Sequence, residues 1–222
     1  MEMNRDMDKE ISVYKSGTQD GHDYVDLGLP SGTKWATCNV GASKPWEYGG
    51  YYAWGETEPK ENYDSSAYKC SSEDDAAHAN WGGKWRMPTR AQQEELLKEC
   101  YWVWTKSYNN SNVKGYIVYK AKNSDDKGKK ISKKNGTPSS SYSLSDAHIF
   151  LPAAGFRIFG DLDNDGSYGY YWSSSLFSDC PEQAWYIYIG FKSGYVYGHI
   201  DFRYYGQSVR AVCPASESPM LA

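Results

Sequence analysis

The chain has 222 residues, a formal net charge of −4 and a mean hydropathy of −0.76, which fits one large domain or two small ones. It has no basic stripe to neutralise phosphates and no window of about 18 apolar residues, so neither nucleic-acid binding nor membrane insertion is expected. Its first ten residues also lack the apolar core of a signal peptide. Aromatic residues are unusually frequent, with 9 Trp and 21 Tyr, so some of them are expected at a binding surface.

The first part of the chain predicts an arm followed by two short strands. Residues 1–22 are mostly polar and charged and are expected to form a flexible arm before a domain at 23–214, with a short tail at 215–222. β-Branched and aromatic residues flank the Pro-Ser-Gly step at 30–32. This pattern predicts two short strands around a turn within residues 24–40.

A helix is predicted next. Thr89 is a plausible N-cap because its hydroxyl can accept a hydrogen bond from an orphan amide. Gln92 or Gln93 lies near the capping-box position, and an apolar stripe carries the helix to about Cys100.

The middle of the chain predicts two further strands, at 101–105 and 115–121, and then a long surface insertion at 123–146. Lysines are dense from 120 to 134, but two aspartates interrupt them, which is typical of a solvated loop. Many short strands, one or two helices and no evident linker predict a single α+β domain.

The stretch at 184–203 alternates with a period of two, which indicates β-strands. A Lys-Ser-Gly step at 192–194 predicts a hairpin turn between them. One parity is mainly aliphatic or aromatic and is expected to be buried: Trp185, Ile187, Ile189, Phe191, Val196, Ile200 and Phe202. The other parity is rich in tyrosine and is expected to face a ligand: Tyr186, Tyr188, Gly190, Tyr195, Tyr197, His199, Asp201 and Arg203.

Several phrases occur in an order that resembles a known family. They are DLGLPSGTKWATCNVG at 26–41, WRMPT at 85–89, LPAAG at 151–155, GYYWSS at 169–174, AW at 184–185 and GQSVR at 206–210. Together they resemble C-type-lectin-fold domains of the formylglycine-generating-enzyme (sulfatase-modifying-factor) type, and within these the variable proteins of diversity-generating retroelements. The resemblance runs from about Tyr24 to Cys213.

The resemblance implies a C-type lectin fold with a variable region at about 151–213 that is rewritten at adenines of a template. Asparagine codons rewritten in this way cannot become Lys, Glu, Gln, Met or Trp, and no residue of the tyrosine-rich parity belongs to these types. The implied function is recognition of a protein or glycan receptor, displayed on a phage virion or a bacterial cell surface. The residues expected to bind the ligand are Phe159, Asp161, Asp165, Tyr168, Leu176, Phe177, Asp179, Tyr186, Tyr188, Tyr195, Tyr197, His199, Asp201, Tyr204 and Tyr205.

The alternative to ligand binding is that these tyrosines have a structural role and pack under a loop. Tyrosine, however, supplies large and fairly rigid contact area with a polar tip, as in antibody paratopes, and this favours binding. A non-diversified bacterial surface domain of the same fold is the second reading, and a formylglycine-generating-type oxidase is the third. No catalytic residue and no cofactor are expected. The late cysteines are Cys180 and Cys213, and Cys180 falls in the variable region.

The string Asp-Leu-Asp-Asn-Asp-Gly at 161–166 matches part of an EF-hand calcium loop. The twelfth position is Trp172, so the bidentate glutamate is missing, and no high-affinity metal site is expected.

Two expectations concern the scaffold. Trp35, Trp85, Trp172 and Trp185 are expected to be buried. Because the two ends of lectin-like domains pair, residues 35–40 are expected beside 208–213, which would bring Cys38 and Cys213 close together.

Overall fold

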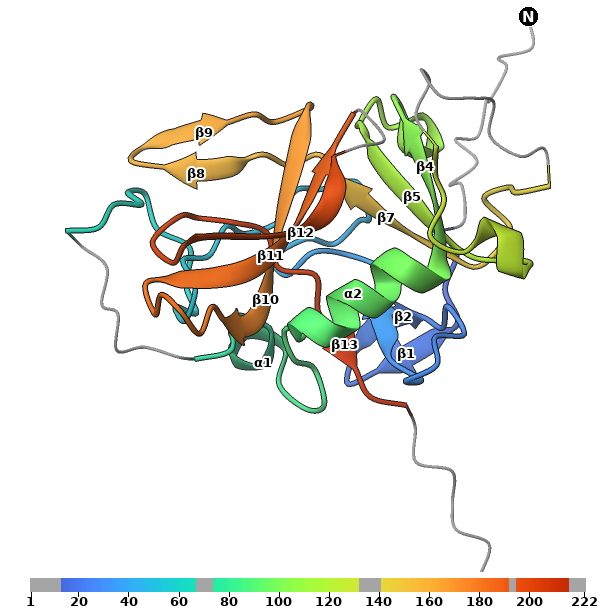
Figure 1. Ribbon diagram of the computed structural model, residues 1–222, viewed down its shortest axis with the longest axis horizontal. Coiled ribbons are helices and arrows are strands. Elements are labelled where there is room, and N and C mark those ends of the chain that lie inside the picture. Colours follow the sequence, from blue (N-terminus) through green and yellow to red (C-terminus); the bar gives the residue numbers. More distant parts are fainter. Residues whose placement is uncertain (1–12, 67–73, 132–140, 192–194, 216–222) are drawn as a thin grey trace, which may run out of the picture.

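The computed structural model describes residues 13–66, 74–131, 141–191 and 195–215, whose strands form four sheets beside two α-helices (Figure 1). The predicted α+β class is therefore confirmed. The first sheet has the order β1-β2-β3-β13. Its strands are β1 (Gly17–Gln19), β2 (His22–Val25), β3 (Lys34–Ala36) and β13 (Val212–Cys213).

This first sheet joins the two ends of the domain. β13 pairs antiparallel with β3, with Val212 opposite Trp35, and Val40 N–H donates to the Val209 carbonyl at 2.9 Å. The predicted pairing of the ends is thus confirmed. The register places Cys213 opposite Lys34, four residues from Cys38 along the chain, and both cysteines are free thiols.

Part of the predicted arm belongs to the same sheet. β1 pairs antiparallel with β2 through a tight turn, in which Asp20 and Gly21 have positive φ. Asp23 holds this hairpin from the side, because it accepts from the Thr18 hydroxyl at 2.7 Å and pairs with Lys15. The arm is therefore ordered from 13 onward, while residues 1–12 and the tail after 215 lie outside the described residues.

Arg210, in the GQSVR phrase, braces the centre of the fold. Its guanidinium is buried and donates to the Asn39 side-chain oxygen and to the carbonyls of Ala36, Thr37 and Phe150, at 2.8–3.1 Å. Burial lowers its pKa. A buried charge is tolerable only when its hydrogen bonds are satisfied, so this arginine fixes the C-terminal segment against two sheets.

Helix α2 (Arg90–Glu99) begins as the sequence predicts. Thr89 and Gln92 form a reciprocal capping box, while Leu96 and Cys100 are buried. The buried Gln93 side chain donates to the carbonyls of Tyr171 and Trp172 at 2.9 and 3.1 Å. Helix α2 is thereby fixed against the strand that supports the candidate site. A second, shorter helix is α1 (Ala76–Trp81).

The second sheet has the order β6-β4-β5-β7 and contains the two strands predicted in the middle of the chain. β4 pairs antiparallel with β5 over its whole length, and both strands are almost entirely buried. Its strands are β4 (Cys100–Thr105), β5 (Gly115–Lys120), β6 (Lys130–Ile131) and β7 (His148–Pro152), with single 3-10 turns at Tyr108–Asn110 and Ser124–Asp126.

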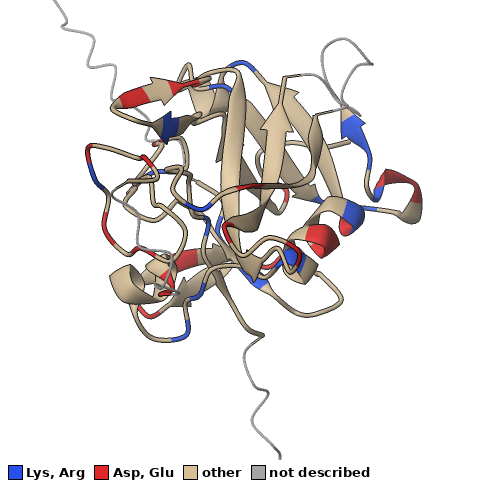
Figure 2. Ribbon diagram, turned by 60° about the vertical axis from the view of Figure 1, so that its left-hand side comes forward, with Lys and Arg blue, Asp and Glu red and all other residues tan. Residues whose placement is uncertain are grey.

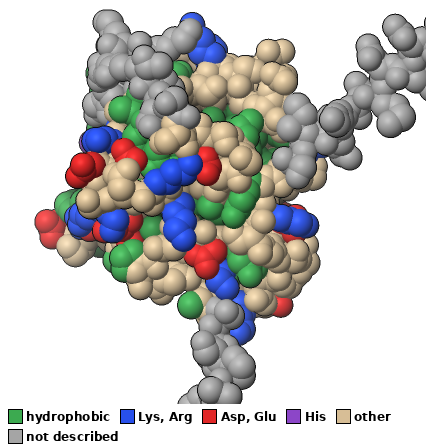
Figure 3. All heavy atoms as spheres, turned by 90° about the vertical axis from the view of Figure 1, so that its right-hand side faces the viewer, with side chains coloured by type: hydrophobic (Ala, Val, Ile, Leu, Met, Phe, Trp, Pro, Cys, Tyr) green, Lys and Arg blue, Asp and Glu red, His purple; other side chains and the backbone are tan. Residues whose placement is uncertain are grey.

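The predicted insertion is anchored at both ends, while residues 132–140 within it lie outside the described residues. Lys122 pairs with Asp146 at 2.8 Å, Lys127 pairs with Glu99 at 2.6 Å, and Tyr142 stacks on Tyr101. Figure 3, which views the molecule from the right of Figure 1, shows basic and acidic side chains interspersed on that face.

The third sheet is the meander β10-β11-β12, and a two-stranded hairpin lies beside it. β11 and β12 pair antiparallel in a regular register, as the alternation predicts, although the turn predicted at 192–194 lies outside the described residues. The strands are β8 (Phe156–Ile158), β9 (Asp161–Asp163), β10 (Tyr168–Leu176), β11 (Gln183–Gly190) and β12 (Val196–Phe202). Among the described residues, no helix is long and apolar enough to cross a membrane.

Candidate ligand-binding face

Aromatic rings on the meander form one connected surface. Tyr188, in the middle of β11, contacts the rings of Tyr168, Tyr195 and Tyr197 at centroid distances of 5.3, 6.0 and 5.5 Å. His199 extends the surface along β12, with its ring 5.9 Å from Tyr197 and 5.8 Å from Tyr186. We call this surface the tyrosine face: Tyr168, Tyr170, Tyr186, Tyr188, Tyr195, Tyr197, His199 and Asp201.

Burial varies strongly across the tyrosine face. Tyr197 is 38% exposed and His199 is also exposed, whereas Tyr168, Tyr188 and Tyr195 are partly buried. Tyr186 is only 6% exposed and Tyr170 only 8%. The prediction that Tyr186 is an exposed ligand contact is therefore wrong, and the loop-packing alternative holds for this one residue. Apart from Tyr170 and Tyr186, the residues of the face are partly or fully exposed to solvent.

Tyr186 is buried because elements far away in sequence cover it. It belongs to a core cluster with Tyr52, Trp54, Trp172 and Val209, and the Trp172 ring lies edge-on at 5.9 Å. Desolvation raises the pKa of its hydroxyl, as it also does for Tyr188. The buried rings of Tyr170 and Tyr186, which are packed into this cluster, form a rigid floor beneath the exposed rings of the tyrosine face.

A second aromatic group continues the surface from Tyr170. Phe156, at the start of β8, lies 4.7 Å from Tyr170 and 5.5 Å from Tyr205. Tyr205 in turn contacts Tyr204 at 4.7 Å. The predicted residues Tyr204 and Tyr205 are therefore joined to the tyrosine face, each of them partly buried.

Asp201 is the only Asp, Glu, Lys or Arg in β10, β11 and β12. Its side chain is half-buried and accepts from the Phe202 amide at 2.9 Å and from Gln207 Nε2 at 3.2 Å. Desolvation raises the pKa of this carboxyl to about 6, although these hydrogen bonds and nearby His199 act in the opposite direction. Figure 2 shows the long strands almost free of charged residues, in contrast to the β8–β9 hairpin and helix α2.

Three other predicted contacts lie on the β8–β9 hairpin or directly after it. Phe159 is 60% exposed with positive φ at the tip of the hairpin, and Asp161 and Asp165 are also exposed. The hairpin meets the tyrosine face at its base, through Phe156 and through Asn164, whose side chain donates to the Tyr170 hydroxyl at 3.2 Å.

The calcium-like string at 161–166 is shared between β9 and the turn that follows it. Within the ranges that the structure describes, no three His, Cys, Asp or Glu side chains gather as potential metal ligands.

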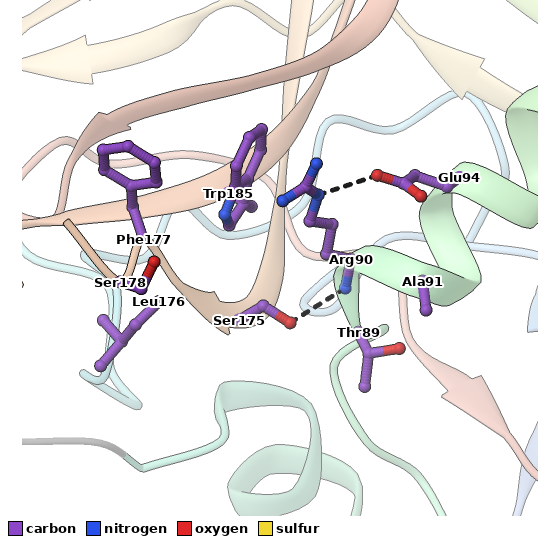
Figure 4. Close-up of a pocket in the computed structure, with 9 residues that line it drawn as sticks. All are labelled: Thr89, Arg90, Ala91, Glu94, Ser175, Leu176, Phe177, Ser178 and Trp185. Carbon is purple, nitrogen blue, oxygen red and sulfur yellow. Dashed lines mark hydrogen bonds and ion pairs between the residues drawn. The ribbon is translucent and has the colours of Figure 1, made fainter. Parts of the chain in front are cut away.

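Phe177 packs on Trp185, on the opposite side of the sheet from the tyrosine face, contrary to prediction, whereas Leu176 lies opposite Ala184 and packs against the cluster that contains Tyr186. Both residues line a cleft of about 490 Å³ with Trp185 and the first turn of α2 (Figure 4). Trp185 has the opposite strand parity to Tyr186, so it points to the other side of the sheet. The Arg90 guanidinium lies 3.5 Å from its ring centroid and also pairs with Glu94. Asp179 is exposed on the turn that follows β10.

Burial of the other parity is confirmed for only part of the strands. Ile187, Ile189 and Val196 are 1%, 0% and 5% exposed. Trp185 and Ile200 are partly exposed, and both exposed phenylalanines deviate further: Phe191 is 45% and Phe202 is 37% exposed. Trp35, Trp85 and Trp172 are buried as predicted, so Trp185 is the exception among the four tryptophans.

Arg203 also departs from the prediction that it faces a ligand. β12 ends at Phe202, and the chain then bends so that Arg203 is 2% exposed, with its guanidinium over the Trp54 ring. Strand parity ceases to apply once the strand ends.

Sequence reasoning missed three residues of the site. Tyr170 and Phe156 belong to its floor and its extension, and Gln207 donates to Asp201. Tyr170, in the GYYWSS phrase, could have been found, because it shares strand parity with Tyr168 just before that phrase. Gln207 and Phe156 are brought in by pairing between segments distant in sequence, which no local pattern reveals.

No family model, curated protein or solved structure matches this chain.

Proposed function

We propose that this protein recognises a ligand through the tyrosine face, as a receptor-binding protein with a C-type lectin fold and a face diversified by a retroelement. The observation that carries the proposal is the connected aromatic surface itself. It combines exposed and partly buried rings with a buried floor, on strands whose other side holds Ile187 and Ile189 in the core.

Physical chemistry supports recognition by such a surface. Tyrosine loses little side-chain entropy on binding and offers both an apolar ring and a hydroxyl. Because the rings of the floor are fixed by packing, those above them are held in place before a ligand arrives, which lowers the cost of association. A scaffold braced by the buried Arg210 also lets exposed residues vary without loss of the fold.

Three cysteines within the described ranges favour binding over an oxidase. Burial raises the thiol pKa of Cys38, Cys100 and Cys213. A reactive thiol needs the opposite shift, towards the thiolate at neutral pH. Cys180 is partly buried in the turn between β10 and β11.

The experiment is a glycan and protein array probed with the purified chain and with matched variants. Tyr188→Ser and Tyr197→Ser are expected to weaken capture of the ligand, with at least one of them costing about 2 kcal/mol or more as a hot spot. Trp185→Ser is the control, because it removes a partly exposed aromatic ring from the same strand but from the other side. Equal loss in all three variants, or no loss in any, would contradict the proposal.

Diversification is tested separately from binding. A near-copy of the 3′ coding region beside a reverse transcriptase gene is expected for a diversified protein. Its absence favours a non-diversified surface or adhesion domain of the same fold.

A further inference from the structure

The three strands of the tyrosine face carry a single charged side chain, and it is an anion. Asp201 is the only Asp, Glu, Lys or Arg among the residues of β10, β11 and β12. It is half-buried, which is costly for a carboxylate that lacks a cation.

No Lys or Arg in the described ranges forms an ion pair with Asp201. Its hydrogen-bond donors are neutral: the Phe202 amide and the Gln207 side-chain amide, the latter at 3.2 Å. Desolvation raises the pKa of the Asp201 carboxyl to about 6, so at neutral pH the ionised form persists at a free-energy cost that a cation would lower.

The surroundings of Asp201 favour the same kind of ligand group. Desolvation raises the pKa of the hydroxyls of Tyr170, Tyr186 and Tyr205, and the negative charge of the Asp201 carboxylate raises them further. Tyrosine rings present a negative face to whatever lies over them, so they attract ammonium and guanidinium groups.

We propose that the ligand of the tyrosine face is a protein segment that places a lysine or arginine side chain against Asp201. This inference rests on the proposed function, and it specifies the chemistry of the ligand. The argument is charge complementarity: a surface of aromatic rings with one half-buried carboxylate is complementary to a cation on an otherwise apolar segment. A neutral glycan offers nothing to offset the unpaired charge.

The test uses an array of pairs of 12-residue peptides, probed with the full chain at pH 7.5. Within each pair, one peptide carries lysine or arginine and the other carries Nε-acetyl-lysine or citrulline at the same position. The charged member is expected to be retained at least about fivefold more strongly, which corresponds to roughly 1 kcal/mol. Asp201→Asn is expected to remove this difference, because it keeps the shape of the side chain but not its charge.

Asp125→Asn is the matched control, since Asp125 is exposed in the 3-10 turn at Ser124–Asp126, outside the three strands and outside the predicted ligand contacts, and the same charge is lost there. It should leave the difference between the paired peptides unchanged. Melting temperatures of both variants near that of the parent establish that they are folded.

Equal retention of charged and neutral peptides, retention of none, or equal effects of the two substitutions would overturn this inference. So would a strong preference for an amino sugar or a quaternary ammonium compound over every peptide. The proposed function is judged by the separate arrays with Tyr188→Ser and Tyr197→Ser, so either conclusion can fail while the other stands.

Discussion

The two ends of the β11–β12 ladder differ in burial although their pairing is equally regular. At one end Ile189 lies opposite Val196, and both side chains are buried. At the other end Trp185 lies opposite Ile200, and both are partly exposed. The first pair packs into the cluster that contains Trp102, whereas the ring of Trp185 meets only the first turn of α2 and Phe177 among the contacts described.

This difference shows that the side of a strand on which a residue lies and the burial of that residue have separate causes. Alternation determines on which side of a strand a residue lies. Whether that side is covered depends on elements far away in the chain. The same distinction holds on the tyrosine face. Tyr186 is covered by the cluster around Trp54, whereas Tyr197, which lies on β12 opposite Tyr188, is not covered.

The prediction with the largest expected effect tests the difference in burial between Tyr186 and Tyr197 on the tyrosine face. Tyr186→Ala should lower the free energy of unfolding by about 3–5 kcal/mol, because it leaves a cavity beside Trp172. Tyr197→Ala should cost less than about 1 kcal/mol, because its ring is already 38% exposed. Chemical denaturation of both variants provides the measurement. Similar costs would show that the two tyrosines share one environment.

The second prediction makes the same comparison on the aliphatic side. Ile189→Ala should destabilise the fold by about 2–5 kcal/mol, because its side chain is fully buried in the main core. Ile200→Ala should cost about 1 kcal/mol or less, because no core encloses it. Thermal melting distinguishes the two. An Ile200 variant as unstable as the Ile189 variant would mean that the open end is core after all.

Local features of this fold were predictable from sequence because their causes are local. The capping box of Thr89 and Gln92 and the pairing of β4 with β5 follow from neighbouring residues. The pairing of the domain ends was predicted only through the family resemblance. The burial of Tyr186 and the bridge of Arg157 to Gly206 were not predictable, because they need contacts between segments whose approach is set by the whole fold.

The residues of the candidate site also fall into two groups: those that local sequence predicts correctly and those that it does not. Tyr188, Tyr195 and Tyr197 come together because they share one parity on two adjacent strands. Phe177 was expected with them on the basis of its position in the variable region alone. The irregular register of β10 between Trp172 and Leu176 ends the simple alternation there, and Phe177 packs on Trp185 instead.

The third prediction concerns pH. The pKa of Asp201 is raised from 3.8 to about 6, so the folded protein binds this proton more tightly than the unfolded chain does. Its contribution to the free energy of unfolding therefore decreases as the pH rises from about 4 to about 6. The stability of the parent relative to Asp201→Asn should fall by on the order of 1–3 kcal/mol across that window.

Comparison with the Asn variant is necessary because other carboxyls titrate with the opposite sign. Hydrogen bonds lower the pKa of Glu47 and of Asp146, so these groups stabilise the fold as the pH rises. The difference between parent and variant isolates Asp201. A difference that is flat, or that grows with pH, would mean that the Asp201 carboxyl is well solvated.

The smallest expected effect tests the open end of the ladder directly. The Arg90 guanidinium lies 3.5 Å from the Trp185 ring centroid and is also paired with Glu94 (Figure 4). Cation–π pairs at exposed sites contribute about 0.5–1 kcal/mol. A double-mutant cycle of Arg90→Ala and Trp185→Ala, read from unfolding curves, should give a coupling energy in this range. The parallel cycle of Arg90→Ala with Glu94→Ala should give about 0.3–0.5 kcal/mol, as is typical of exposed pairs one helical turn apart. A Trp185 coupling above about 2 kcal/mol would mean that the ring is desolvated, and the contrast between the two ends of the ladder would then disappear.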